Sequence, residues 1–181
     1  MRELTGGPAT RMRTTRHTSI CGWYMRDLFP FYGIKQPERN RLLKAHLDEY
    51  GQPSADDLNA VVRGLWLRPE RECHYTALDL LKKQINKVPA QSMSLIAQLI
   101  VTKSWWDTVD ALINYAGILF IRLPEVRSDY LPNWRTSDDL WLRRSAILFQ
   151  RTYKKETDVE LLLTIIGENL GSDEFFINKA I

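Results

Sequence analysis

Two tryptophans and two aspartates lie close together in the sequence KSWWDTVD, which spans positions 103–110. A tryptophan face attracts a cation by roughly 0.5–2 kcal/mol. A carboxylate about 4 Å from a positive charge adds roughly 4 kcal/mol at an effective dielectric constant of about 20, before desolvation is subtracted. A carboxylate can also orient a water molecule as a general base. These residue types are therefore suited to a site for a cationic group.

Helical spacing divides the residues of this stretch into two groups. One group has a structural explanation, as part of the cap or of the core, and the other group does not. With Ser104 as the N-cap, Asp107 lies in the first turn, where the cap and the helix dipole account for a carboxylate. Trp106 and Asp110 are four residues apart and share a polar face with Lys103. Packing of Trp106 under a neighbouring helix remains the alternative. The predicted apolar stripe of this helix contains Trp105, Val109, Leu112, Ile113 and Ala116.

A second cluster, WLRRSAILFQ at 141–150, contains an arginine in an unusual place. In helical projection Arg144 lies between Leu140 and Ile147, among residues that suit a core stripe. The guanidinium fork matches both carboxylate and phosphate oxygens. Two interpretations stay open: an ion pair between Arg144 and an internal aspartate, or a phosphate contact.

The chain has 181 residues, of which 44% are apolar and 26% are charged, which fits one domain with a core. Residues 1–19 carry four arginines and one glutamate, so their charge of +3 equals that of the whole chain. This segment lacks an apolar period and is predicted to be a disordered basic arm. We expect no membrane span and no secretory signal, because no apolar run is long enough. The cysteines Cys21 and Cys73 and the three histidines lack metal-ligand spacing, so we expect free thiols, no metal and no cofactor.

The rest of the chain is predicted to be all-α. Apolar residues recur at helical spacing, and no segment alternates with period two. An alanine followed by a branched aliphatic residue recurs at Ala77, Ala111, Ala146 and Ala180, with spacings of 34, 35 and 34 residues. This period is typical of stacked helical pairs, so the sequence predicts a helical-repeat solenoid. The predicted helices are 20–29, 37–50, 54–67, 69–86, 90–102, 105–121, 124–130, 138–153, 158–169 and 172–181.

Seven segments, in order, carry a family resemblance: YMRDLF at 24–29, FYGIKQPER at 31–39, PERE at 69–72, TALDLL at 76–81, TKSWWDTVD at 102–110, DLWLRRSAILFQ at 139–150 and EFFINKAI at 174–181. With them the chain resembles the DNA alkylation repair family, the alkylpurine DNA glycosylases built of HEAT-like repeats. The resemblance implies a curved, right-handed, all-α HEAT-like solenoid over residues 20–181. Its concave face would hold duplex DNA, and its activity would hydrolyse the N-glycosidic bond of N3- or N7-alkylated purines.

The resemblance also assigns roles to residues. Asp110 matches the catalytic carboxylate, Trp106 the aromatic that packs on the deoxyribose of the lesion, and Arg144 the arginine of the site. An N7-alkylpurine is cationic and already a good leaving group, so a carboxylate that stabilises an oxocarbenium-like sugar and positions water would suffice. The residues expected to contact DNA are Tyr24, Lys35, Arg39, Lys103, Arg143 and Lys154.

The resemblance further implies a binding partner, a location in the cell and a limit on the activity of these residues. We expect a monomer that binds double-stranded DNA with alkylated purines, in the cytoplasm and on the nucleoid when bound. Family members continue after Lys-Ala-Ile with a Gly-Trp and a Leu-Arg-Glu-Tyr-like segment, which add a tryptophan and an arginine to the site. We therefore expect that the C-terminal part of the family domain is missing and that these 181 residues alone have weak or no activity. A non-catalytic scaffold that binds DNA or a protein through its concave face is the alternative.

Overall fold

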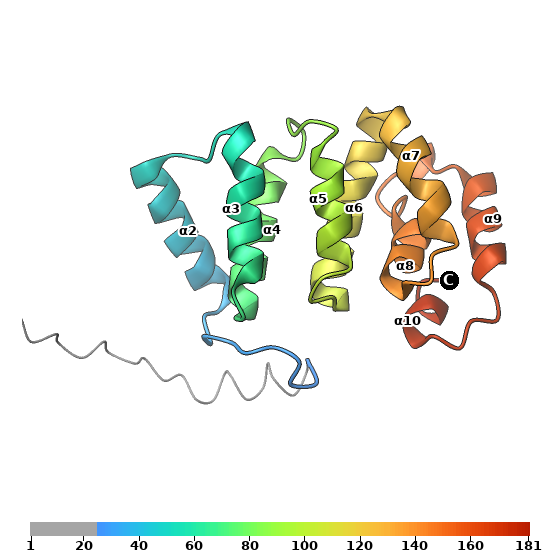
Figure 1. Ribbon diagram of the computed structural model, residues 1–181, viewed down its shortest axis with the longest axis horizontal. Helices are drawn as coiled ribbons and strands as arrows, with labels where there is room; N and C mark the ends of the chain where they lie inside the picture. The colour runs from blue at the N-terminus through green and yellow to red at the C-terminus, as the bar shows by residue number, and fades with distance from the viewer. Residues whose placement is uncertain (1–24) are drawn as a thin grey trace, which may run out of the picture.

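The computed structural model describes residues 25–181, except the side chain of Asp56, and every regular element in that range is helical (Figure 1). The all-α prediction is confirmed there. The predicted arm at 1–19 and residues 20–24 of the first predicted helix lie outside the described residues. Residues 25–29 form a turn rather than a helix. The α-helices are α2 (Gln36–Tyr50), α3 (Ala55–Leu67), α4 (Arg71–Gln84), α5 (Ser92–Ile100), α6 (Trp106–Arg122), α7 (Pro124–Arg135), α8 (Leu140–Leu148), α9 (Val159–Asn169) and α10 (Phe175–Asn178), with a 3-10 turn, η1 (Lys154–Glu156).

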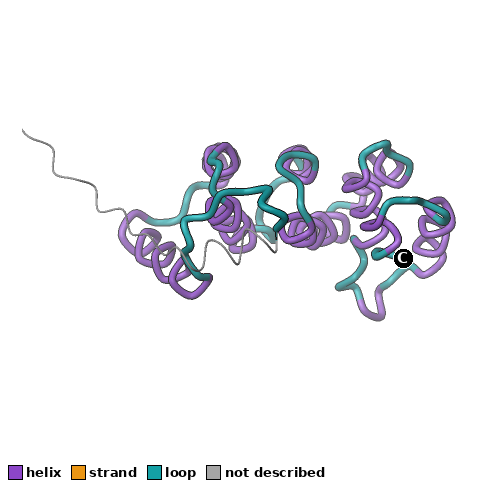
Figure 2. Tube along the Cα trace, turned by 90° about the horizontal axis from the view of Figure 1, so that it is seen from below, coloured by secondary structure: helices purple, strands orange, loops and turns teal. Residues whose placement is uncertain are grey.

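The helices stack as pairs along the long axis of the molecule. Within the pairs α3 packs on α4, α5 on α6 and α7 on α8. The second helices form an unbroken row, in which α4 contacts α6, α6 contacts α8 and α8 contacts α10. On the other side α3 contacts α5, and α7 contacts α9, so two rows of helices enclose the core (Figures 1 and 2). The recurrent alanines Ala77, Ala111 and Ala146 lie in α4, α6 and α8, as the predicted repeat requires, whereas the fourth, Ala180, lies after α10, which is shorter than the predicted helix 172–181.

Hydrogen bonds between repeats join residues that are about one repeat apart. The hydroxyl of Tyr115 donates to the carbonyl of Leu78 at 3.0 Å, and that of Tyr153 donates to Gly117 at 2.7 Å. The sequence separations are 37 and 36 residues. Burial raises the pKa of Tyr153 to about 12, so this hydroxyl stays a donor at neutral pH. The side chains of one helical pair therefore fasten the backbone of the pair before it.

A glycine sets the distance between α6 and α8. A Cβ atom built on Gly117 would lie 2.3 Å from the carbonyl oxygen of Phe149, which is closer than atoms can approach. The absence of a side chain lets the end of α8 approach the α6 backbone and lets Tyr153 reach the Gly117 carbonyl. The register between these two helices matters below, because each contributes to the candidate site.

The predicted N-cap of α6, Ser104, is wrong, whereas the caps of α3 and α9 use their side chains. Ser54 does cap α3 and accepts a hydrogen bond from the backbone N–H of Asp57 at 3.1 Å. Asp158 caps α9 and accepts a hydrogen bond from the backbone N–H of Leu161 at 3.0 Å. Helix α6 begins at Trp106 with Trp105 as its N-cap, whereas the hydroxyl of Ser104 donates back to the Ile100 carbonyl.

Candidate active site

The carboxylate of Asp110 binds two arginines that come from the next repeat. Asp110 lies in the second turn of α6, four residues after Trp106. Oδ1 accepts hydrogen bonds from Arg144 Nε at 3.1 Å and Nη2 at 3.0 Å, and Oδ2 accepts from the same Nη2 at 3.2 Å. Oδ2 also accepts from Arg151 Nη1 at 3.2 Å. The Asp110 side chain is 24% exposed, so the carboxylate that these two guanidiniums bind is still partly accessible to solvent.

Phe176 of α10 holds the Arg144 side chain in place. This arginine side chain is 7% exposed, and its Nη1 donates to the carbonyl of Phe176 at 2.8 Å. The guanidinium carbon also lies 5.9 Å from the centre of the Phe176 ring. Of the two interpretations of Arg144, the ion pair with an internal aspartate is the one observed. Since α10 supplies Phe176, three successive repeats build this contact.

Arg151 approaches Asp110 from solvent. It follows the end of α8, and its side chain is 34% exposed. Besides Oδ2 it reaches the backbone carbonyl of Asp110 through Nη2 at 2.9 Å, and the side-chain oxygen of Asn114 through Nε at 2.7 Å. All three contacts are with α6, so Arg151 ties the turn after α8 to the surface of the neighbouring helix.

The aromatic residues beside Asp110 rest on a cluster of rings. Trp106 is half-buried and packs against the hydrophobic core, as the structural alternative for this residue expected. Trp105 lies on the predicted core stripe, and its ring centre is 6.2 Å from Trp141 and 5.2 Å from Phe176. Trp141 and Phe176 are 4.9 Å apart. These three rings support both the start of α6 and the arginine that binds Asp110.

Asp107 has a larger role than the predicted dipole and cap interaction. It accepts hydrogen bonds from Arg71 Nη2 at 2.6 Å and Nε at 3.1 Å, and from the hydroxyl of Tyr75 at 2.7 Å. Arg71 is fully buried and also donates to the hydroxyl of Thr108 at 2.7 Å. Burial and the charge of Asp107 raise the pKa of Tyr75, which keeps its proton on the donor. This carboxylate therefore fastens α4 to α6.

Lys103, predicted to contact DNA, has its ammonium at the C-terminus of α3. Nζ donates to the carbonyls of Trp66 at 2.8 Å, Leu67 at 3.1 Å and Arg68 at 2.7 Å. Burial and the nearby Arg71 lower the pKa of this lysine. A cation at this end of a helix stabilises the unpaired carbonyls and the negative end of the dipole.

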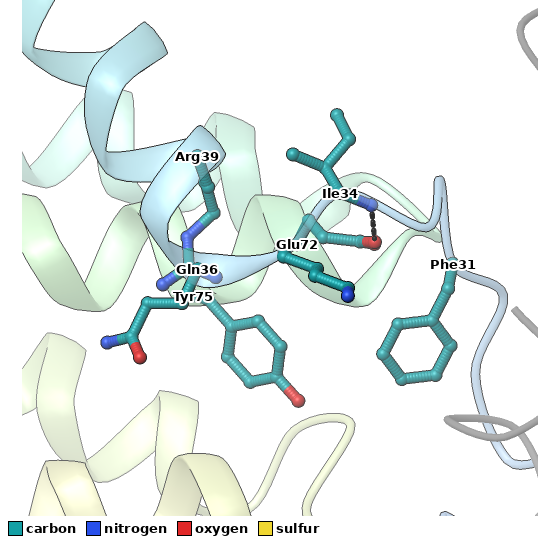
Figure 3. A pocket seen from close by; sticks show the side chains of 7 residues that line it. Phe31, Ile34, Gln36, Arg39, Glu72 and Tyr75 are labelled. Atoms are coloured by element: carbon teal, nitrogen blue, oxygen red, sulfur yellow. Dashed lines mark hydrogen bonds between the residues drawn. The ribbon is translucent and has the colours of Figure 1, made fainter. Parts of the chain in front are cut away.

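Lys35 and Arg39, two further predicted DNA contacts, line a pocket of about 480 Å³ between the start of α2 and α4 (Figure 3). Arg39 donates to Asp79 at 3.0 Å, and its guanidinium carbon lies 5.1 Å from the Tyr75 ring centre. Figure 3 shows Arg39 beside Tyr75, with Phe31 on the opposite side of the pocket. Tyr75 links this pocket to Asp107, one turn before Asp110 on α6.

The remaining predicted contacts are dispersed. Arg143 donates from its guanidinium to the carbonyl of Ser137, at the turn before α8. Lys154 is exposed in η1, close in sequence to Arg151. Tyr24 lies outside the described residues. The structure thus brings Trp106, Asp110 and Arg144 together and leaves the predicted basic contacts spread from α2 to η1.

Residues 25–181 contain no cluster of three potential metal ligands. No helix in this range is long and apolar enough to cross a membrane. The described side chains at the site are a carboxylate, two guanidiniums and an indole.

Sequence reasoning missed Arg151, Asn114 and Phe176. The repeat period held a usable signal, because Asp110, Arg144 and Phe176 follow one another at intervals of 34 and 32 residues. Residues one period apart lie on neighbouring helices of the same row. A search by repeat period from Asp110 finds Arg144 and then Phe176, which binds Arg144, but it does not find Arg151, which lies 41 residues after Asp110.

These features define a class of protein: a helical-repeat protein in which arginines of one repeat bind a partly exposed carboxylate of the repeat before it. The chain belongs to the DNA alkylation repair enzyme family, whose family model matches residues 11–181. It is similar to a solved structure described as a predicted DNA alkylation repair enzyme from Enterococcus faecalis, with a TM-score of 0.84 and 27% sequence identity over 93% of this chain and 79% of that one. No curated protein matches the sequence. Its family implies DNA as the substrate.

Proposed function

We propose that this chain is a DNA glycosylase that hydrolyses the N-glycosidic bond of N3- or N7-alkylated purines in duplex DNA. The observation that carries the proposal is the environment of Asp110. It is a partly exposed carboxylate, oriented by two guanidiniums and one helical turn after Trp106. An alkylated purine is cationic, and its departure leaves an oxocarbenium-like sugar, so the reaction develops positive charge that a fixed carboxylate stabilises.

Each residue has a role that its position supports. Asp110 would stabilise the sugar cation and orient the attacking water. Trp106 would supply an aromatic face to the deoxyribose or to the cationic base. Arg144, held between Asp110 and the Phe176 carbonyl, would hold the carboxylate in a fixed orientation. Arg144 in this proposal positions Asp110 and does not contact the reacting atoms.

Base release from alkylated DNA tests the proposal. Duplex DNA treated with a methylating agent is incubated with the wild-type chain and with Asp110→Asn, and released 7-methylguanine and 3-methyladenine are measured. We expect weak release by the wild type and a further loss of roughly 100-fold or more in the variant, the usual contribution of a positioned base or charge. Equal rates for the two proteins would refute the role of Asp110.

The second candidate function is a non-catalytic scaffold that binds DNA or a protein. One observation favours it: an arginine–aspartate contact between neighbouring repeats also occurs at Arg71 and Asp107, where it is buried and structural. An ion pair at Asp110 therefore does not by itself require catalysis. No base release from either protein, with duplex binding retained, would support the scaffold.

The proposal includes a monomer that works in the cytoplasm, associated with the nucleoid when bound to DNA. Sedimentation of the chain alone and with a short duplex would test the stoichiometry. A two-to-one complex with contacts between protein copies would contradict the monomer.

A further inference from the structure

The hydrogen bonds of Asp110 use all of its acceptor capacity. Each carboxylate oxygen can accept about two hydrogen bonds. Oδ1 receives Nε and Nη2 of Arg144, and Oδ2 receives Nη2 of Arg144 and Nη1 of Arg151. In this state the carboxylate has no vacant lone pair to orient a water molecule or face a sugar cation, so one of these bonds has to be released before it can do either.

Of the two arginines, Arg151 is the one that can leave. Arg144 is nearly buried and is held by a backbone carbonyl of another helix, so its departure would leave a cation without a partner in the interior. Arg151 is 34% exposed, so water can replace its three hydrogen bonds to α6, of which the one to Oδ2 is the longest at 3.2 Å. Exchange of an exposed ion-pair partner costs little, because water screens both charges.

The backbone under Arg151 does not need to move. Tyr153 anchors the turn through its bond to the Gly117 carbonyl, and Gln150 exchanges two hydrogen bonds with the backbone of Asp158. The peptide N–H of Arg151 itself donates to Leu148 at 2.9 Å. Motion is therefore confined to the arginine side chain, which can swing while the turn stays in place.

We infer that Arg151 is a latch on Asp110 that duplex DNA opens: in the free protein it holds Oδ2, and in the complex it exchanges the carboxylate for a backbone phosphate. A guanidinium binds carboxylate and phosphate oxygens alike, and Arg151 gives Oδ2 only one hydrogen bond, whereas a phosphate can accept two from the same fork. Phosphate contact would uncover Oδ2 only when DNA lies on the protein. Arg151 is thus a positioning residue, and the inference rests on the proposed function for the use of the uncovered oxygen.

A double-mutant cycle on binding of undamaged duplex tests the latch without requiring catalysis. The four proteins are the wild type, Asp110→Asn, Arg151→Gln and the double variant, and thermal unfolding verifies that each is folded. If Asp110 competes with phosphate for Arg151, Asp110→Asn tightens binding when Arg151 is present, and the gain shrinks by about threefold or more when Arg151 is absent. Arg151→Gln also lowers the slope of log K against log salt by about 0.9, the loss of one phosphate contact.

Two control variants complete the test. Arg135→Gln removes an arginine that pairs with Glu168 between α7 and α9, on the other row of helices, and leaves the salt slope unchanged. Arg151→Lys keeps the charge and loses the fork, so its coupling to Asp110 lies between those of the wild type and Arg151→Gln.

The outcomes separate the latch from the glycosylase. Additive effects of the two substitutions, an unchanged salt slope, or no binding of duplex by the wild type would each overturn the latch. Coupling between Asp110 and Arg151 in duplex binding, without base release by the wild type, would support the latch. It would contradict the glycosylase and favour the scaffold as the function. A fall in the maximal rate of base release in Arg151→Gln, with no coupling in binding, would show a permanent clamp instead and would also overturn the exchange.

Discussion

Two arginine–aspartate pairs lie one helical turn apart on α6, and they differ in what surrounds them. Asp107 receives Arg71, which is fully buried, and its other partner is the Tyr75 hydroxyl from the core side. Asp110 receives Arg144, and its other partner is the exposed Arg151. The same two residue types thus make a structural contact where the arginine is fully buried. They make a candidate site where one partner faces water.

The largest expected difference between the two pairs is in the loss of unfolding free energy when the arginine of each pair is replaced. Arg71→Met leaves Asp107, whose side chain is 11% exposed, without its cation, which costs about 3 kcal/mol of unfolding free energy. Arg144→Met should cost less, because Asp110 is partly exposed and keeps Arg151. Urea denaturation of both variants and the wild type measures this. A larger loss in Arg144→Met would reverse the assignment of the structural pair.

Isosteric changes of the two aspartates should separate stability from activity. Asp107→Asn weakens two bonds to Arg71 and one from Tyr75, and we expect a loss of about 2–3 kcal/mol in stability. Asp110→Asn should change stability by about 1 kcal/mol and remove base release. Denaturation and release assays on the same preparations check both. Similar losses of stability in the two variants would erase the distinction.

The buried pair has a titratable neighbour, His74, that makes it sensitive to acid. Burial, with the charges of Arg71 and Lys103 nearby, lowers the pKa of His74 from 6.5 to about 4. Between these values the unfolded chain binds a proton that the folded protein does not, so stability falls as the pH drops through this window. The loss attributable to His74 should be about 2 kcal/mol between pH 7 and pH 5.

His74→Gln provides the control for that prediction. Glutamine does not titrate, so the difference in unfolding free energy between pH 7 and pH 5 should be smaller in the variant than in the wild type. Identical pH profiles for the two proteins would show that His74 is protonated in the folded state as readily as in the unfolded one.

The smallest expected effect on stability concerns Lys103, which precedes Asp107 and Asp110 in the sequence. Lys103→Met removes an ammonium from three carbonyls at the end of α3, and we expect a loss of about 1 kcal/mol. Lys154→Met, at an exposed position, is the matched control and should leave stability within about 0.5 kcal/mol of the wild type. Thermal unfolding of the two variants would resolve this difference.

The sequence contained most of the fold and about half of the candidate site. Helical spacing separated Trp105 and Val109 from Trp106 and Asp110, because positions on one helix follow a fixed angle per residue. It offered no way to choose between an aspartate and a phosphate for Arg144, since that choice depends on a helix 34 residues away. The role of Asp107 was underestimated for the same reason, as Arg71 lies 36 residues before it.

Local backbone geometry explains the wrong cap of α6. The backbone at Lys103 adopts a left-handed conformation with φ of 52°, and its ammonium binds the carbonyls that end α3. This moves the start of α6 one residue later, so Trp105 becomes the N-cap in place of Ser104. A contact with another repeat therefore overrides the local preference of serine for the cap position.

The one-repeat spacing of the side-chain hydrogen bonds also has a kinetic consequence. A bond such as Tyr115 to Leu78, or Tyr153 to Gly117, closes a loop of 36–37 residues wherever it lies in the chain. The entropy of loop closure varies slowly with loop length, so ordering each new pair against a formed neighbour costs nearly the same amount. Folding can then start at any adjacent two pairs and spread outward, and its rate should depend weakly on the number of pairs. Unfolding should correspondingly begin at an end, and α4 to α8 should be the last segment to exchange its amide hydrogens with solvent.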